Sequence, residues 1–257
     1  MSSDKTRIAR RDENFWVKIL ENRKKRVNAW DNAQVVLADV PLDKQAVKRI
    51  LPLGMSPSDP PLATLFLINY PTVAYPLFPY KEAIMMVHVR TLLGKGRHTC
   101  WIIVDDDPAM ILGRELLGFP KKNGLFVFDD NKEAIAASIT RRNITVMSMT
   151  AVRGVREPSP QPVFGHKTFH YGGLGQFMSF SPVWMFRPKE VIKESHQAEI
   201  KLTLNDSDHD PIARLVAGEP RNGRIVVMDI PGGGAYMLPV GIAGPFVFGR
   251  TFNMRFR

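Results

Sequence analysis

Residues 113–122 read Gly-Arg-Glu-Leu-Leu-Gly-Phe-Pro-Lys-Lys, and they are the most informative stretch of the 257-residue chain. A predicted helix ends here at Gly118, since glycine readily takes the left-handed conformation that stops a helix. Pro120 stiffens the exit, and Lys121 and Lys122 follow it directly. Spacing alone favours an exposed, solvated lysine pair.

Three helices are predicted; two share the same Asp-Pro start and Gly stop, and the third follows Pro41 and ends before Pro52. Before the lysine pair, the Asp107 carboxylate can cap free N–H groups, and Pro108 suits a first helical turn. The predicted helices are Asp43 to Leu51, Asp107 to Gly118, and the segment from Asp210 and Pro211 to Gly218.

The rest of the chain predicts many short strands separated by Pro and Gly turns, which is typical of a β-barrel or sandwich. Arg142 and Asn143 are predicted to form a hairpin turn, and the proline-rich stretch Glu157 to Pro162 a loop within one domain. The predicted strands are Ala63 to Asn69, Ala83 to Leu93, Thr99 to Asp105, Gly124 to Phe128, Ala134 to Arg141, Ile144 to Val152, Met178 to Arg187, Gln197 to Leu204, Gly223 to Met228, Ala235 to Pro239 and Gly244 to Asn253.

Composition excludes several classes of protein. With 44% apolar and 23% charged residues, the chain is an ordinary globular one. Cys100 is the only cysteine, which rules out an internal disulfide and is typical of a reducing cytoplasm. It lies in an apolar strand, so we expect an inert core thiol. Because no apolar run has membrane-spanning length and the first residues lack an apolar signal core, we expect a soluble, cytoplasmic protein.

The net charge of +10 is concentrated at the termini. Residues 1–30 hold nine Lys or Arg against four Asp or Glu, and the last eight residues hold three against none. We therefore expect a basic N-terminal extension over residues 1–30, with residues 23–26 forming a solvated or subunit-bridging tail. A basic-tail nucleic-acid binder remains an alternative, but the body shows no basic face interleaved with aromatics, so we expect no nucleic-acid partner.

Three other motifs have simpler explanations. His166 and His170 have metal-ligand spacing for a helix, but glycines flank them, so we expect no metal site. The glycine run 232–234 opens no predicted helix and is interpreted as a turn. The aspartates 105–107 are explained by a strand end followed by a helix cap.

Three elements in register resemble the acetoacetate decarboxylase superfamily. Residues 113–122 resemble its G-R-E, four residues, P-K-K signature, and Tyr80 with Glu82 resembles its Y-x-E element. Glu82 and Lys121 are 39 positions apart, as in the family, and Asp107-Pro108-Ala109 between them resembles its helix start. The similarity covers residues 62–129 and is faint elsewhere.

The resemblance implies a lysine Schiff base. Lys121 would attack a ketone to give an iminium, Lys122 would favour the neutral amine by repulsion, and Glu82 would act as general acid and base. Apolar neighbours such as Phe119 and Leu125 would also favour the neutral amine over the charged form. Tyr80, two strand positions from Glu82, is a candidate substrate ligand.

Arg114 and Phe119 complete the expected substrate-binding residues. An architectural role in the helix would explain Arg114 about as well as contact with the substrate would. No metal or organic cofactor is required, because the iminium withdraws electrons itself.

Two charged groups of the true decarboxylases are missing. Where the resemblance places an arginine and a second glutamate, near residues 32–34 and 65–67, this chain has Asn-Ala-Gln and Leu-Phe-Leu. Without a group to hold the carboxylate, alignment for decarboxylation is in doubt. We therefore expect a pyruvate aldolase-dehydratase, or a hydratase of unsaturated 2-oxo acids. An acetoacetate decarboxylase and a non-catalytic small-acid binding protein remain alternatives.

The expected architecture follows from the same resemblance. Residues 31–257 would form one mainly antiparallel α+β domain, a closed cone-shaped β-barrel with a few helices. The protein would assemble as a homo-oligomer, a tetramer or larger. Its partners would be a small anionic 2-oxo acid and possibly an aldehyde co-substrate, with no membrane.

Overall fold

The computed structural model describes residues 17–22, 24–25, 27–131, 133–173, 180–232, 235–245 and 254–255. Its helices are α2 (Lys44–Ile50), α3 (Asp107–Glu115) and the 3-10 helix η1 (Pro211–Leu215). Its strands are β1 (Asn28–Pro41), β2 (Ser56–Pro57), β3 (Leu62–Tyr70), β4 (Thr72–Val73), β5 (Tyr80–Thr91), β6 (Gly94–Val104), β7 (Lys121–Asn123), β8 (Leu125–Asp130), β9 (Ala134–Arg141), β10 (Ile144–Arg156), β11 (Thr168–Tyr171), β12 (Ser181–Pro188), β13 (Val191–Leu204), β14 (Arg221–Pro231) and β15 (Ala235–Ala243).

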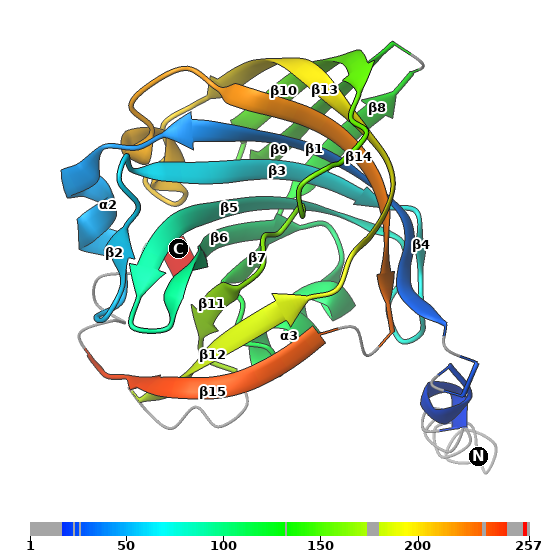
Figure 1. Ribbon diagram of the computed structural model, residues 1–257, viewed down its shortest axis with the longest axis horizontal. Coiled ribbons are helices and arrows are strands. Elements are labelled where there is room, and N and C mark those ends of the chain that lie inside the picture. The colour runs from blue at the N-terminus through cyan, green and yellow to red at the C-terminus, as the bar shows by residue number, and fades with distance from the viewer. Residues whose placement is uncertain are drawn as a thin grey trace, which may run out of the picture.

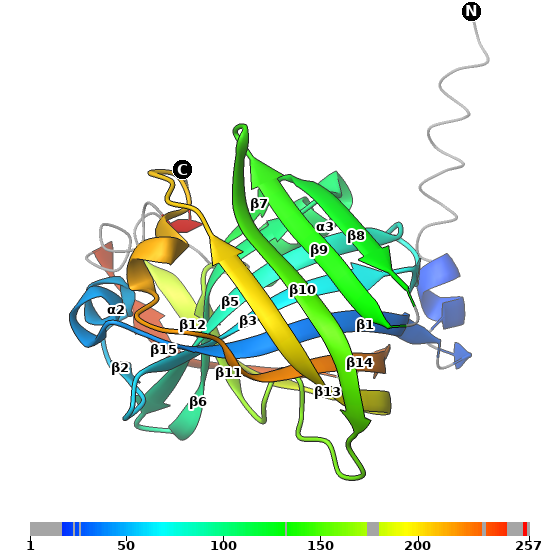
Figure 2. The same ribbon diagram turned by 90° about the horizontal axis from the view of Figure 1, so that it is seen from above.

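The strands form one strongly curved sheet (Figures 1 and 2). Its hydrogen-bonded order is β15-β12-β11-β6-β5-β3-β1-β14-β13-β10-β9-β8, with three short strands off this path. Among the strands that the structure describes, only the pairs of β6 with β7 and with β11 are parallel, so the expected mainly antiparallel α+β class is confirmed.

The expected closed barrel is not confirmed. The hydrogen-bonded path ends at β15 and β8. Residues 121–130 instead change partners at Gly124, because β7 pairs with β6 whereas β8 pairs with β9. A Cβ at Gly124 would lie 2.6 Å from both Ile103 Cγ2 and Ile139 Cδ1, so glycine is needed where the chain crosses between the strands.

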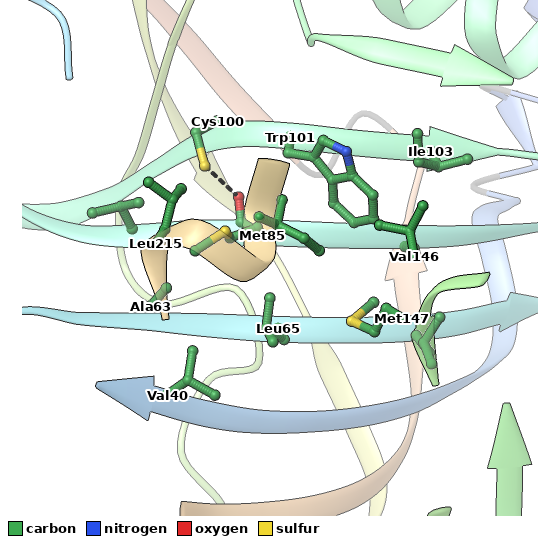
Figure 3. Packing of buried hydrophobic residues seen from close by; sticks show 14 of the residues in the cluster. Val40, Ala63, Leu65, Met85, Cys100, Trp101, Ile103, Val146, Met147 and Leu215 are labelled. Atoms are coloured by element: carbon green, nitrogen blue, oxygen red, sulfur yellow. Dashed lines mark hydrogen bonds between the residues drawn. The ribbon is translucent and has the colours of Figure 1, made fainter. Parts of the chain in front are cut away.

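Hydrophobic residues cover both faces of the central strands. One cluster collects Leu65, Trp101, Ile139 and others from β1, β3, β5, β6, β9 and β10, with α2 and η1 packed against it (Figure 3). A second cluster on the opposite face contains Phe66, Ile102 and residues of β14 and α3. Both alternating positions of these strands are therefore buried, which makes β5 and β6 a rigid base for any side chain they carry.

Most predicted strands are found, although several begin or end elsewhere. The predicted hairpin at Arg142 and Asn143 is confirmed, and their positive φ angles of 50° and 64° are those of a tight two-residue hairpin turn. Strands β1 and β11 were not predicted, and β1 starts inside the expected N-terminal extension, at Asn28. The predicted strand Gly244 to Asn253 and the glycine run 232–234 fall largely outside the described residues.

The helices differ in detail from the prediction. Asp43, which begins the predicted helix, caps α2 by accepting from the Ala46 N–H, although no cap was predicted there. Asp106, rather than Asp107, caps α3, and Gly118 adopts the expected left-handed conformation with a φ of 74°. The third predicted helix is only the short η1, and the Asp210 side chain makes no capping hydrogen bond. Its carboxylate is turned into the protein instead, as described below.

Candidate active site

Strand register places Lys121 and Glu82 on the same face of the sheet. In β7, Lys121 lies beside Ile102 of β6, whereas Glu82 of β5 lies beside Val104 of β6. Ile102 and Val104 both belong to the second hydrophobic cluster. Since neighbouring residues across a sheet point to the same face, the two functional side chains emerge together into this cluster.

The two groups form a buried ion pair. Lys121 Nζ lies 2.8 Å from Glu82 Oε2, within hydrogen-bond distance. Lys121 is 7% exposed and Glu82 is 5% exposed. At this distance a proton can pass directly from the ammonium to the carboxylate. The pair therefore has the two parts that imine chemistry needs, a nitrogen and a nearby proton carrier.

Aromatic rings form one wall beside the ion pair. Lys121 Nζ lies 5.4 Å from the centre of the Tyr80 ring, a cation–π distance. The Tyr80 ring lies 4.7 Å from the Tyr70 ring, and its hydroxyl accepts a hydrogen bond of 3.1 Å from Trp30 Nε1. Burial, followed by the nearby Glu82 charge, raises the pKa of Tyr80 well above 10. Tyr80 therefore stays a neutral phenol.

Lys122 does not lie beside Lys121. Its neighbour in β6 is Ile103, which belongs to the first cluster, so its side chain enters the opposite face. There Lys122 Nζ is ion-paired with Asp210 and donates to the His209 carbonyl at 3.0 Å. Burial, partly offset by Asp210, lowers the pKa of Lys122 to about 8. The structure thus separates the two ammonium groups that the sequence analysis expected to repel each other.

The Asp210 carboxylate accepts hydrogen bonds from three side-chain donors within the first hydrophobic cluster. Besides Lys122, it accepts from Trp101 Nε1 and from Arg141 Nη1, each at 2.8 Å. Burial opposes the ionisation of Asp210, but attraction to Lys122 and the three hydrogen bonds outweigh it, and its pKa is lowered. This charge cluster anchors β7 from the side opposite Lys121.

Arg114 and Phe119 hold the backbone around Lys121. Arg114 Nη1 donates to the carbonyls of Lys121 and Arg255, at 2.8 and 3.2 Å. The Phe119 ring stacks 4.3 Å from the His170 ring. Leu125 was wrongly expected to shield the lysine, because it is 74% exposed on β8. Arg114 therefore contacts the backbone at Lys121, and Phe119, two positions before the lysine, contacts the His170 ring.

Open clefts lie elsewhere on the molecule. A cleft of about 930 Å³ is lined by His166, Arg187, Glu190 and neighbouring residues, and Lys121 is not among them. The buried pair is the better candidate site than this cleft, because it brings a shielded amine within hydrogen-bond distance of a carboxylate.

Several expectations about other residues can also be assessed. Cys100 is buried, and burial raises the pKa of its thiol to about 12, as expected for an inert thiol. His170 lies in a buried strand rather than a helix, whereas His166 is exposed. The described residues contain no group of three or more His, Cys, Asp or Glu placed to hold a metal ion. None of the helices in the described ranges is long and apolar enough to cross a membrane.

Most of the chain matches a known protein family. The family model for acetoacetate decarboxylase matches residues 19–238, which is most of the chain. The chain belongs to the acetoacetate decarboxylase family. Decarboxylase DEC1 of Cochliobolus heterostrophus is 30% identical over 100 residues, a match that spans 39% of each protein.

Solved structures share the fold of this acetoacetate decarboxylase family member at low identity. The acetoacetate decarboxylase of Legionella pneumophila has a TM-score of 0.73 and 16% identity, covering 81% of this chain and 86% of that one. The enduracididine biosynthesis enzyme MppR, complexed with pyruvate, has a TM-score of 0.66 and 14% identity, covering 80% and 88%. An acetoacetate decarboxylase-like enzyme from Sphingomonas wittichii has a TM-score of 0.67 and 15% identity, covering 82% and 92%.

The sequence analysis missed several residues that shape the site. Trp30 and Tyr70 were not considered because β1 was not predicted and Tyr70 lies just beyond the predicted end of β3. Asp210 was interpreted only as a helix cap, since an Asp-Pro pair is a common helix start. One signal in the sequence could have revealed this role of Asp210. Lys121 and Lys122 are adjacent in an extended segment, so their side chains must point to opposite faces of the sheet. If both are buried, the second lysine needs a charged partner of its own.

Proposed function

We propose that this protein is a lyase that forms a Schiff base through Lys121 and acts on 2-oxo acids. The observation that carries the proposal is the buried contact of 2.8 Å between Lys121 Nζ and Glu82 Oε2. A buried lysine with a carboxylate as its direct partner has the composition of an imine-forming site. Membership in the acetoacetate decarboxylase family supports this chemistry.

The residues divide the first half of the reaction between them. Glu82 accepts a proton from the Lys121 ammonium, and the freed amine attacks the carbonyl carbon of the substrate. The resulting carbinolamine loses its hydroxyl as water, with the proton supplied by Glu82, and leaves an iminium on Lys121. The Tyr80 ring lies beside this cationic nitrogen, where its face favours a positive charge.

The second half depends on the substrate. With pyruvate, Glu82 removes a methyl proton to give an enamine, which can add to an aldehyde carbon. Loss of water and hydrolysis of the imine then release an unsaturated 2-oxo acid and the free lysine. Support for this branch comes from MppR, which has been solved with pyruvate and with the condensation product of pyruvate and imidazole 4-carboxaldehyde. In the reverse sense the same steps would hydrate an unsaturated 2-oxo acid.

Decarboxylation of acetoacetate is the second candidate. The family model is named for acetoacetate decarboxylase, and the fungal relative is named a decarboxylase without a stated substrate. Charged groups were expected within residues 32–34 and 65–67, however, and the members of those stretches that lie in the second cluster with the site are Ala33 and Phe66, both fully buried. A carboxylate partner would have to come from elsewhere in the chain, so we favour the 2-oxo acid reaction.

Borohydride trapping tests the proposal. The protein is incubated with pyruvate or acetoacetate, reduced, and analysed by intact mass, while carbon dioxide release is followed in parallel. We expect an adduct with pyruvate that is lost in Lys121→Ala and retained in the matched control Lys81→Ala, on the same strand as Glu82. Carbon dioxide release from acetoacetate would favour the decarboxylase instead. No adduct with either compound would indicate a binding protein.

A further inference from the structure

Gly113 is a glycine in a helical position where alanine would be intrinsically favoured. It lies in α3 (Asp107–Glu115) and is buried. In a helix interior, glycine costs more conformational entropy than any other residue and offers no side chain to pack. Such a local conflict is expected where function or close packing demands it.

The space beside Gly113 is filled by the Lys121 side chain. A Cβ built on Gly113 would lie 2.6 Å from Lys121 Cδ, 2.7 Å from Lys121 Cε and 3.4 Å from Lys121 Nζ. Ordinary carbon–carbon contacts are about 3.5–4.0 Å. The aliphatic part of Lys121 therefore runs across the helix in direct contact with the Gly113 backbone, which covers it from water.

The backbone around this contact is fixed by four hydrogen bonds. The Phe119 N–H donates to the Gly113 carbonyl at 3.0 Å, and the Gly118 N–H donates to the Arg114 carbonyl at 3.2 Å. The Lys121 N–H donates to the Phe119 carbonyl at 2.8 Å, and Arg114 Nη1 donates to the Lys121 carbonyl at 2.8 Å. These bonds hold α3 and β7 together, so an added methyl at position 113 would displace the flexible lysine side chain rather than the backbone.

We propose that Gly113 is a positioning residue for Lys121. Because Gly113 has no side chain, the surface of α3 has a notch at this position. The notch holds the Lys121 side chain so that its Nζ lies 2.8 Å from Glu82 Oε2. The inference rests on the proposed role of Lys121, and it adds that helix α3 selects the rotamer in which the amine is reactive. With alanine at position 113, the lysine must leave the notch and its contact with Glu82.

The test is Gly113→Ala with Gly241→Ala as the matched control. A Cβ at Gly241 would meet nothing closer than 3.8 Å, at Val183 Cβ, so that substitution is accommodated. The rate of borohydride-trapped adduct formation with pyruvate is measured from pH 5 to pH 10, beside circular dichroism and thermal unfolding. We expect Gly113→Ala to keep the fold and to lower the trapping rate by on the order of 100-fold, since small misplacements of reacting groups have effects of this size. An unchanged rate and pH profile would overturn the proposal.

A double-mutant cycle, measured by melting temperature, tests the contact between Gly113 and Lys121 without any substrate. Gly113→Ala is also made in the Lys121→Ala background, where the clashing side chain is absent. There we expect the melting temperature to rise, because alanine is favoured in a helix, whereas with Lys121 present it should stay level or fall. Equal shifts in both backgrounds would overturn the proposal, even if Gly113→Ala alone proved poorly folded. If wild-type protein formed no adduct but the cycle showed coupling, the proposed function would fail while the notch would stand.

Discussion

Replacement of Asp210 by alanine should destabilise the protein strongly, because its carboxylate compensates two buried cations. The side chains of Asp210, Lys122 and Arg141 are 1%, 5% and 13% exposed. Asp210→Ala would leave the ammonium of Lys122, the guanidinium of Arg141 and the indole N–H of Trp101 without this acceptor. Each of these groups would then lack a bond that offsets the cost of its burial.

The expected loss follows from the cost of an unpaired buried charge. Removing one partner of a buried ion pair typically costs about 3–5 kcal/mol. For a protein of this size, about 1 kcal/mol shifts the melting temperature by roughly 2–4 °C, so the midpoint should fall on the order of 10 °C. The exposed pair Asp206–Arg214, with side chains 58% and 51% exposed, is the contrast, and Asp206→Ala should cost far less than Asp210→Ala because water screens the pair.

Urea unfolding followed by tryptophan fluorescence and circular dichroism measures these differences. Asp210→Asn keeps the volume and one acceptor oxygen but removes the charge, so it separates charge from cavity formation. Lys122→Met removes one cation and leaves Asp210 with Arg141 and Trp101, so it should cost less than Asp210→Ala. The reasoning would be refuted if Asp210→Ala cost no more than Asp206→Ala, or if Asp210→Asn were as stable as wild type.

Three further predictions concern other parts of the fold. Cys100 should resist thiol reagents in the native protein at pH 8 and react after unfolding, because burial raises its pKa to about 12; rapid native labelling would contradict this. Gly124→Ala should lower the free energy of unfolding by about 1–3 kcal/mol in urea titration, because its methyl meets two isoleucine side chains at 2.6 Å, whereas Gly241→Ala should not. Burial lowers the pKa of His98 to about 4 and of His170 to about 3, whereas the unfolded chain binds these protons near pH 6.5. The contribution of each histidine to stability is therefore full above pH 6.5 and falls by about 1.4 kcal/mol per unit below it, down to about pH 4 for His98 and about pH 3 for His170; replacing His170 by Phe should reduce that slope.

Local sequence signals predicted the elements that carry strong punctuation. The Arg142-Asn143 hairpin and the left-handed stop at Gly118 were recoverable because turn and helix-stop chemistry acts within a few residues. Strand β1 was missed although it has 14 residues, since both of its faces are buried and it lacks the alternation of a half-exposed strand. Strand β11, with four buried residues, has the same character and is too short for a periodic signal.

The pairing of Lys121 with Glu82 was predicted, and the residues around the pair were predicted less well. Lys121 and Glu82 were chosen through a family resemblance, and the register of β5, β6 and β7 brings them together. The role of Gly113 could not be predicted, because the helix crosses the lysine only once the strand has folded back along β6. The two residues are only eight positions apart, but their contact depends on how the chain turns between α3 and β7, which composition and spacing do not specify.

Adjacent lysines in an extended strand point to opposite faces of the sheet, so substitutions of Lys121 and Lys122 should affect different parts of the protein. Lys121 lies with Glu82 in one hydrophobic cluster, whereas Lys122 lies with Asp210 in the other. A charge placed across the sheet, with its own carboxylate beside it, repels Lys121 weakly, because that carboxylate largely cancels its field. Lower activity in a Lys122 variant would therefore reflect a loosened β7, and a comparison at equal folded fraction distinguishes this from a change in the reactivity of the Lys121 amine.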